Sequence, residues 1–148
     1  MTKKFKAKPF RVWLDDLARN CVKARDGRVC QKSGRLLVDK CNCHWAHIKG
    51  RSRNCLRWRL ENALTLSGEE HKWGHDNPAD FEIWFKSVWP ERWTYIEAEW
   101  KKPLCTWRES DYREVERYLI EQCKIYNVRP ENMGSQTFRS RLSKLMGA

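Results

Sequence analysis

The sequence predicts a mainly helical α+β fold, because a stretch without helical spacing lies between two stretches that have it. In residues 9–25, and again beyond residue 68, apolar side chains recur every three or four positions and so fall on one face of a helix. Residues 28–66 instead hold two short apolar runs, 36–38 and 63–66, among many basic side chains. This stretch predicts short strands and a long loop.

The first helix is expected to run from Pro9 to about Arg25. Proline is tolerated in the first turn of a helix, and Asp26-Gly27 marks a turn after the last one. The apolar face of this helix is formed by Phe10, Trp13, Leu14, Leu17 and Cys21.

Prolines and a capping serine divide the rest of the chain into short helices. Asn77-Pro78 ends the first of them, and Pro90 ends the next, which covers 79–88. Ser110 is expected to cap a long amphipathic helix. In order, the remaining predicted helices are 91–101, 110–126 and 135–146. The tryptophans of 84–107 are expected to pack in the interior rather than stack on bases.

The length of 148 residues fits one domain. Its expected parts are a basic arm at 1–8, an N-terminal helix at 9–27, a core at 28–90 and a helical C-terminal extension at 91–148. No apolar run approaches the roughly 20 residues that cross a bilayer, and no apolar stretch follows the N-terminal lysines, so neither a membrane segment nor a secretory signal is expected. Seven cysteines, an odd number, predict reduced thiols in the cytoplasm.

The net charge of +11 is concentrated in the first part of the chain. Residues 1–60 hold 17 basic and 4 acidic side chains, whereas residues 61–148 hold 13 and 15. Such uneven basic charge favours a polyanionic partner, nucleic acid first, although the same charge also serves solubility.

Four histidines, His44, His47, His71 and His75, all fall within 32 residues. His71 and His75 are four positions apart, so a helix would present both imidazoles on one face, where they can share a metal ion. An isolated pair of this kind is more often two solvated histidines. Here Asn62 lies 15 positions after His47 and 9 before His71.

With these spacings, the segments WAHIKGR, RLENALTL and EEHKWGH resemble the HNH, or ββα-metal, nucleases over roughly residues 28–90. The spacings are similar to those of colicin DNases, and the segments themselves are closer to phage HNH proteins such as the NinG-type recombination nucleases. The resemblance implies a small ββα-metal motif embedded in the helical domain. His47 would end the first strand, Asn62 would lie in the return strand, and His71 and His75 on the crossing helix.

The resemblance further implies a metal-dependent DNA endonuclease that hydrolyses phosphodiester bonds and leaves a 5′-phosphate and a 3′-hydroxyl. His47 would be the general base, since an imidazole pKa near neutrality suits proton abstraction from water. Asn62 would hold the backbone of the loop that bears His47. His71 and His75 would hold one divalent ion, and two imidazoles favour Zn²⁺, Ni²⁺ or Mn²⁺ over Mg²⁺.

A basic run inside the hairpin is expected to contact DNA phosphates, with strongly salt-dependent binding; a solvated loop is the alternative. It consists of Lys49, Arg51, Arg53, Arg57 and Arg59. RNA remains open as the substrate. A double-strand break would require a homodimer or two events, because one such site cuts one strand.

Two features depart from the family pattern. Colicin-type enzymes carry a metal ligand directly before the base, where this chain has Ala46. Many phage relatives also hold a structural zinc between two CxxC pairs, which here read Cys30-Gln31-Lys32-Ser33 and Ser67-Gly68-Glu69-Glu70. Three of the four thiols are absent, so no structural zinc of this kind is expected.

Candidates for a third ligand of the catalytic ion are His44, Glu70 and Asp76. An alternative structural site would combine Cys30, Cys41, Cys43 and His44.

A function of a different class is a catalytically decayed HNH scaffold that binds DNA or protein. The absence of three thiols favours a scaffold that has lost its activity. The retained residues His47, Asn62, His71 and His75 favour the enzyme. The resemblance to phage nucleases implies a role in phage DNA recombination or processing, in the cytoplasm of a bacterial host.

Overall fold

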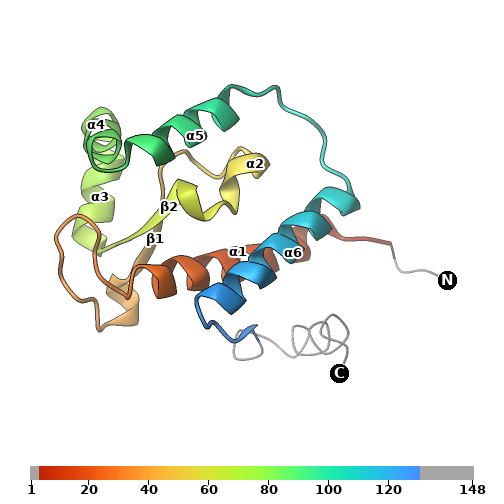
Figure 1. The fold of residues 1–148 in the computed structure, drawn as a ribbon, viewed down its shortest axis with the longest axis horizontal. Helices are drawn as coiled ribbons and strands as arrows, with labels where there is room; N and C mark the ends of the chain where they lie inside the picture. The colour runs from red at the N-terminus through yellow and green to blue at the C-terminus, as the bar shows by residue number, and fades with distance from the viewer. Residues whose placement is uncertain (1–3, 131–148) are drawn as a thin grey trace. The chain divides into compact units, whose positions relative to one another are not determined.

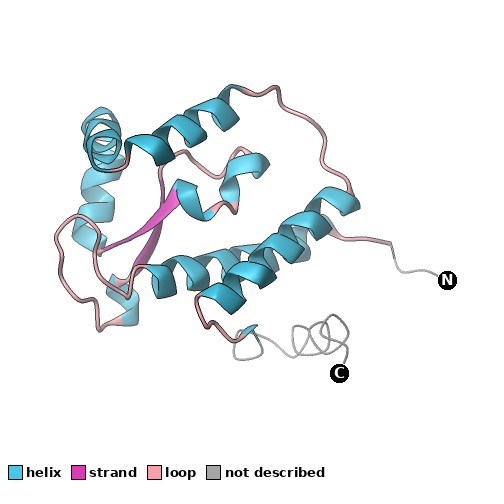
Figure 2. Cartoon of the chain, in the orientation of Figure 1, coloured by secondary structure: helices cyan, strands magenta, loops and turns pink. Residues whose placement is uncertain are grey.

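The computed structural model describes residues 4–130, and in this range the chain is α+β, as predicted: helices accompany one two-stranded antiparallel sheet (Figures 1 and 2). No helix in this range is long and apolar enough to span a membrane. The helix expected at 135–146 lies outside the described residues. In order, the elements are α1 (Ala7–Arg25), β1 (His44–His47), α2 (Asn54–Arg57), β2 (Ala63–Leu66), α3 (Gly68–Asp76), α4 (Pro78–Val88), α5 (Pro90–Lys101) and α6 (Glu109–Ile125), with short 3₁₀ turns at Lys40–Asn42 and Leu60–Asn62.

The chain divides into two compact units. Among the described residues, one unit combines residues 4–21 with residues 106–130, and the other is Val22–Cys105. The second unit contains the sheet and all four histidines. Its limits differ from the core expected at 28–90, because α5 belongs to the same unit as the hairpin and not to a C-terminal extension.

The first unit is built on the apolar faces of α1 and α6. Phe10 lies against Tyr112, the Trp13 indole donates to the buried Glu116 at 2.7 Å, and the thiols of Cys21 and Cys123 are 3.3 Å apart. All five residues of the face predicted for α1 are buried.

Two details of these helices differ from the prediction. Helix α1 begins at Ala7, so Pro9 stands within its first turn and the last residues of the expected basic arm are already helical. Ser110 does not cap α6. The helix begins at Glu109, and the Asp111 carboxylate accepts from the Arg108 N–H at 2.7 Å, which satisfies a donor of the first turn from within the helix.

In the second unit, the apolar run 63–66 forms β2 as predicted, but the run 36–38 does not form a strand. Leu36 makes only a single bridge with Val29, and Val38 is 81% exposed. The partner of β2 is the polar stretch β1, in a register that sets His44 against Leu66 and His47 against Ala63.

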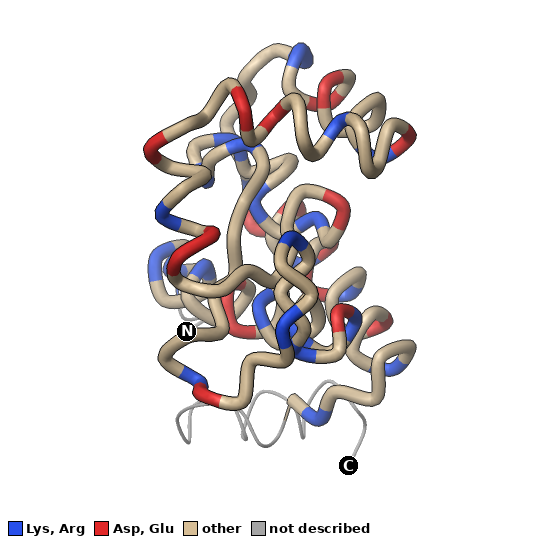
Figure 3. The backbone as a smooth tube through the Cα atoms, turned by 90° about the vertical axis from the view of Figure 1, so that its left-hand side faces the viewer, with Lys and Arg blue, Asp and Glu red and all other residues tan. Residues whose placement is uncertain are grey.

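Helices α3, α4 and α5 follow β2 as the proline pattern predicts, and α4 and α5 each begin at a proline. Tryptophans of these helices pack against the buried core around β1 and β2: Trp73, Trp84, Trp89, Trp93 and Trp100. Basic and acidic positions are interleaved along the helical parts of the backbone (Figure 3).

Candidate functional site

The first turn of α3 lies directly on the first residue of β1. Ser67 caps the helix by accepting from the Glu70 N–H at 3.3 Å, and the Gly68 N–H donates to the Asn42 side chain at 2.8 Å. A Cβ atom at Gly68 would lie 3.5 Å from His44 Nε2 and 3.1 Å from Asn42 Oδ1. The contact with Asn42 would be tight and the one with His44 ordinary, so the lack of a side chain at Gly68 favours chiefly the hydrogen bond of its N–H to Asn42.

His71 and His75 lie side by side on α3, with their Nε2 atoms 3.1 Å apart. Two nitrogens that each bind one ion at about 2.0–2.1 Å, at angles between the octahedral and tetrahedral values, are about 2.8–3.4 Å apart. The observed separation fits two ligands of a common ion. The same separation also allows one ring to donate a hydrogen bond to the other.

Of the three candidates for a third ligand, His44 is in contact with this pair. Its Nδ1 lies 2.9 Å from Nδ1 of His71. Glu70 instead pairs with Lys32 at 3.2 Å, and Asp76 pairs with Lys72. Within residues 4–130 no group of three or more His, Cys, Asp or Glu side chains is arranged to hold one ion.

Burial, and after it the neighbouring rings of His75 and His44, lower the pKa of His71 from 6.5 to about 4. His71 is therefore neutral at physiological pH. A neutral imidazole retains the lone pair that a metal ion requires.

This shift predicts how the stability of the metal-free protein depends on pH. Between pH 6.5 and 4 the unfolded chain protonates His71 and the folded chain does not, so the free energy of unfolding falls as the pH is lowered through this range. His71→Asn should show a shallower fall, measured by urea denaturation at a series of pH values with a chelator present. The exposed Lys86→Asn on α4 is the control, and equal pH dependence in all three proteins would contradict the assignment.

His47 is the last residue of β1, and its Nε2 lies 2.9 Å from the carbonyl oxygen of Arg57. A carbonyl only accepts, so Nε2 carries the proton and Nδ1 carries the lone pair. The Trp45 and His47 rings are 4.2 Å apart, as expected for side chains on the same face of a strand.

The structure brings His44 into contact with His71, and His71 into contact with His75, whereas His47 stands at the other end of β1 from His44. Strand alternation sets His47 on the face opposite His44, and the two residues stand at the two ends of β1, about 10 Å apart along the strand.

Asn62 was expected in the return strand but lies just before β2, in the 3₁₀ turn, where it is fully buried and holds the chain that follows His47. Its Oδ1 accepts from the Lys49 N–H at 2.9 Å, and its Nδ2 donates to the Lys49 carbonyl at 2.9 Å and to the Leu56 carbonyl at 3.2 Å. The Ile48 N–H also donates to the Asn62 carbonyl, at 2.8 Å. Residues 48 and 49, directly after His47, are thus fixed by one side chain and its backbone.

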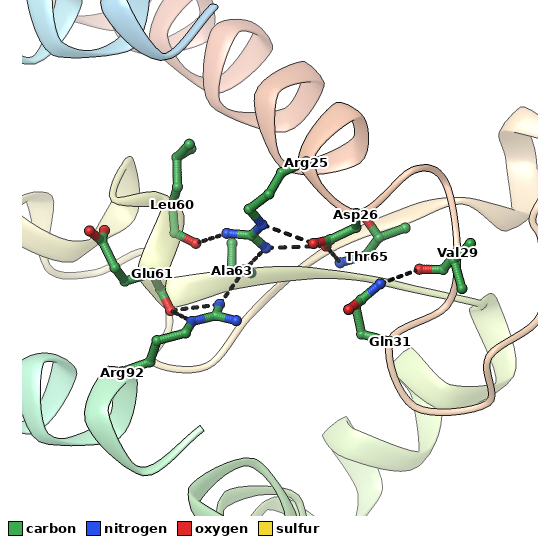
Figure 4. A network of polar contacts seen from close by, with 9 residues as sticks. All are labelled: Arg25, Asp26, Val29, Gln31, Leu60, Glu61, Ala63, Thr65 and Arg92. Carbon is green, nitrogen blue, oxygen red and sulfur yellow. Dashed lines mark hydrogen bonds and ion pairs between the residues drawn. The ribbon is translucent and has the colours of Figure 1, made fainter. Parts of the chain in front are cut away.

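A network that the sequence did not indicate supports this turn (Figure 4). Arg25 and Arg92 both donate to the Ala63 carbonyl, at 2.7 and 2.9 Å, and each binds one further carbonyl of residues 60–61. Asp26 binds the Arg25 guanidinium and accepts from the Thr65 N–H at 2.8 Å. An arginine at a helix end carries no local signal for such a contact, because its acceptors are 35 or more positions away.

The basic run of the hairpin is divided between internal and exposed positions. Lys49 pairs with Glu82 at 2.7 Å, and the Arg53 guanidinium lies over the Trp100 ring and donates to the Lys102 carbonyl at 2.9 Å. Arg51 is exposed, and Arg57 and Arg59 are half-buried. Lys49 and Arg53 therefore also serve to fold the loop against neighbouring helices.

The two stretches that correspond to the CxxC pairs of phage relatives, which begin at Cys30 and Ser67, lie close together and interact through polar groups. The buried Cys30 thiol contacts the Ser67 hydroxyl at 3.8 Å and accepts from the Ser33 N–H at 3.5 Å. The ion pair of Lys32 with Glu70 joins the same two stretches. Thiol, hydroxyl and ion-pair contacts therefore connect the stretches that a zinc ion would connect.

Comparisons of this chain with protein-family models, with curated proteins and with solved structures found no match.

Proposed function

We propose that this chain is a metal-dependent endonuclease that hydrolyses phosphodiester bonds of DNA. The observation that carries the proposal is the pair of Nε2 atoms 3.1 Å apart on His71 and His75. Their helix directly follows a hairpin that bears His47 in a fixed tautomer. The order β1, β2, α3, with antiparallel strands, is the order expected of a ββα-metal nuclease.

The residues supply complementary parts of the chemistry. His71 and His75 would hold a divalent ion, which when bound stabilises charge on the phosphate and on the leaving oxygen. Nδ1 of His47 takes the proton of the attacking water, while its Nε2–H remains on the Arg57 carbonyl and fixes the ring. Fission of the bond to the 3′-oxygen leaves a 5′-phosphate and a 3′-hydroxyl.

The test is cleavage of supercoiled plasmid with Mg²⁺, Mn²⁺, Ni²⁺ or Zn²⁺. We expect nicked or linear DNA with at least one of these ions, and complete loss of cleavage on adding a chelator. Binding of DNA without cleavage under every condition would instead support a decayed scaffold. Preferential cleavage of a matched RNA would reassign the substrate while keeping the chemistry.

The division of the basic run predicts unequal contributions to DNA binding. Removing a side chain that binds one phosphate should reduce the slope of log affinity against log salt by about one. Because Arg51 is exposed, Arg51→Ala should show this reduction. Lys49→Ala should show less, since the ammonium is already paired with Glu82 at 2.7 Å. Fluorescence anisotropy of a labelled duplex, with chelator to prevent cleavage, measures both slopes, and a larger effect at Lys49 would contradict this division.

A further inference from the structure

His44 lies in a chain of hydrogen bonds that ends at His71 and His75, the two proposed metal ligands. Its Nε2 lies 3.0 Å from the carbonyl oxygen of Cys41, and its Nδ1 lies 2.9 Å from Nδ1 of His71. Nε2 of His71, in turn, faces Nε2 of His75. The order of atoms along this chain determines where each proton lies.

The carbonyl of Cys41 can only accept, so the proton of neutral His44 is on Nε2. Nδ1 of His44 is then an acceptor, and the hydrogen bond between the two Nδ1 atoms requires that His71 carries its proton on Nδ1. Nε2 of His71 is left with the lone pair. This is the nitrogen that faces His75, and the tautomer is the one a shared ion requires.

The His44 ring is itself held firmly. Asp39 accepts from the Cys41 N–H at 2.9 Å and so fixes the turn that presents the Cys41 carbonyl. The Nε2 and Cε1 atoms of the ring also lie 3.5 and 3.6 Å from the position that a Cβ atom of Gly68 would take, in the first turn of α3. A rigid acceptor of this kind can impose a tautomer on its neighbour.

We infer that His44 is a positioning residue that holds His71 in the tautomer with Nε2 available to a metal ion; this inference rests on the proposed function. His44 would not be a ligand of the same ion, because it contacts Nδ1 of His71, whereas His71 would bind the ion through Nε2, on the opposite side of the ring. Metal-binding histidines generally donate their second N–H to a carbonyl or carboxylate. Here an imidazole, anchored on a carbonyl, is the acceptor.

The experiment compares wild type with His44→Phe, which keeps a ring but removes the acceptor, and with His44→Asn, whose Oδ1 atom can take the place of Nδ1. Long-range ¹H–¹⁵N correlation spectra of the full chain without metal report the tautomer of His71 directly. We expect the proton on Nδ1 in wild type and in His44→Asn, and its transfer to Nε2 in a substantial fraction of His44→Phe. Retention of the Nδ1–H tautomer in His44→Phe would overturn the inference.

Calorimetric titration with Zn²⁺ supplies the second measurement. Loss of the partner of a metal-bound histidine typically costs about 10–100-fold in affinity, so His44→Phe should bind one Zn²⁺ that much more weakly, and His44→Asn should recover part of the loss. Unchanged affinity in His44→Phe, or loss of one imidazole from the zinc coordination sphere by X-ray absorption, would contradict a positioning role. If wild type binds none of Mg²⁺, Mn²⁺, Ni²⁺ and Zn²⁺, the proposed function fails, and the tautomer spectra still decide the role of His44.

Discussion

Replacing His47 with alanine is expected to lower the single-turnover rate of plasmid cleavage by about 10²–10⁴-fold, the usual contribution of a general base. The expectation rests on the hydrogen bond of Nε2 to the Arg57 carbonyl, which leaves the lone pair on Nδ1. Zn²⁺ affinity should be unchanged, because His71 and His75 are on α3 and the His47 side chain is on the other face of β1. Quenched-flow cleavage and calorimetry measure the two quantities on the same preparations.

The same histidine also has a structural contact, so a matched variant is needed. Glutamine can place an amide N–H near the position of Nε2 and donate to the Arg57 carbonyl, but it cannot take a proton from water. His47→Gln should therefore be as inactive as His47→Ala while retaining more of the wild-type stability. Recovery of cleavage in His47→Gln would show that the ring acts through its contact with Arg57 and not as a base. The exposed Lys86→Ala should cleave at the wild-type rate.

The sequence predicted the elements whose signals are local. The proline positions and three-to-four-residue spacing of α4 and α5 are properties of short windows. A strand that ends at His47 was expected only from the family resemblance, because HWAH has no apolar alternation of its own and pairs as β1 with β2. The prediction of a strand at 36–38 was wrong, because an apolar run forms a strand only where another strand pairs with it. Leu36 makes only a single bridge.

The candidate site likewise has parts that a short window of sequence predicts and parts that depend on contacts between distant residues. The spacing of four residues was sufficient to place His71 and His75 on one helix face. The contact of His44 with His71 depends on the docking of α3 at Gly68, which no window of sequence reveals. The hydrogen bonds of Arg25 and Arg92 to the Ala63 carbonyl likewise depend on helices that are distant from Ala63 in the sequence.

Replacing Asn62 with alanine should be the most damaging change to the folded hairpin that leaves every histidine in place. The substitution removes three hydrogen bonds and leaves the Lys49 N–H and the carbonyls of Lys49 and Leu56 without this partner. An unsatisfied buried group costs about 1–3 kcal/mol, and the two Lys49 groups are only partly buried and therefore cost less, so we expect a loss of about 2–4 kcal/mol in the free energy of unfolding. Urea denaturation measures this loss.

The effect of Asn62 on cleavage should exceed its effect on folding. Because its side chain fixes Lys49, two positions after His47, its loss leaves the base imprecisely placed even in molecules that remain folded, and errors of about 1 Å in a catalytic group can cost 10²-fold. Trp13→Phe is the matched control, because it removes the 2.7 Å bond to the buried Glu116 within the other unit and so destabilises the chain through a different contact. At a temperature where both variants are folded, Asn62→Ala should cleave slowly and Trp13→Phe at the wild-type rate. If both variants cleave at the wild-type rate, Asn62 serves the stability of the hairpin alone.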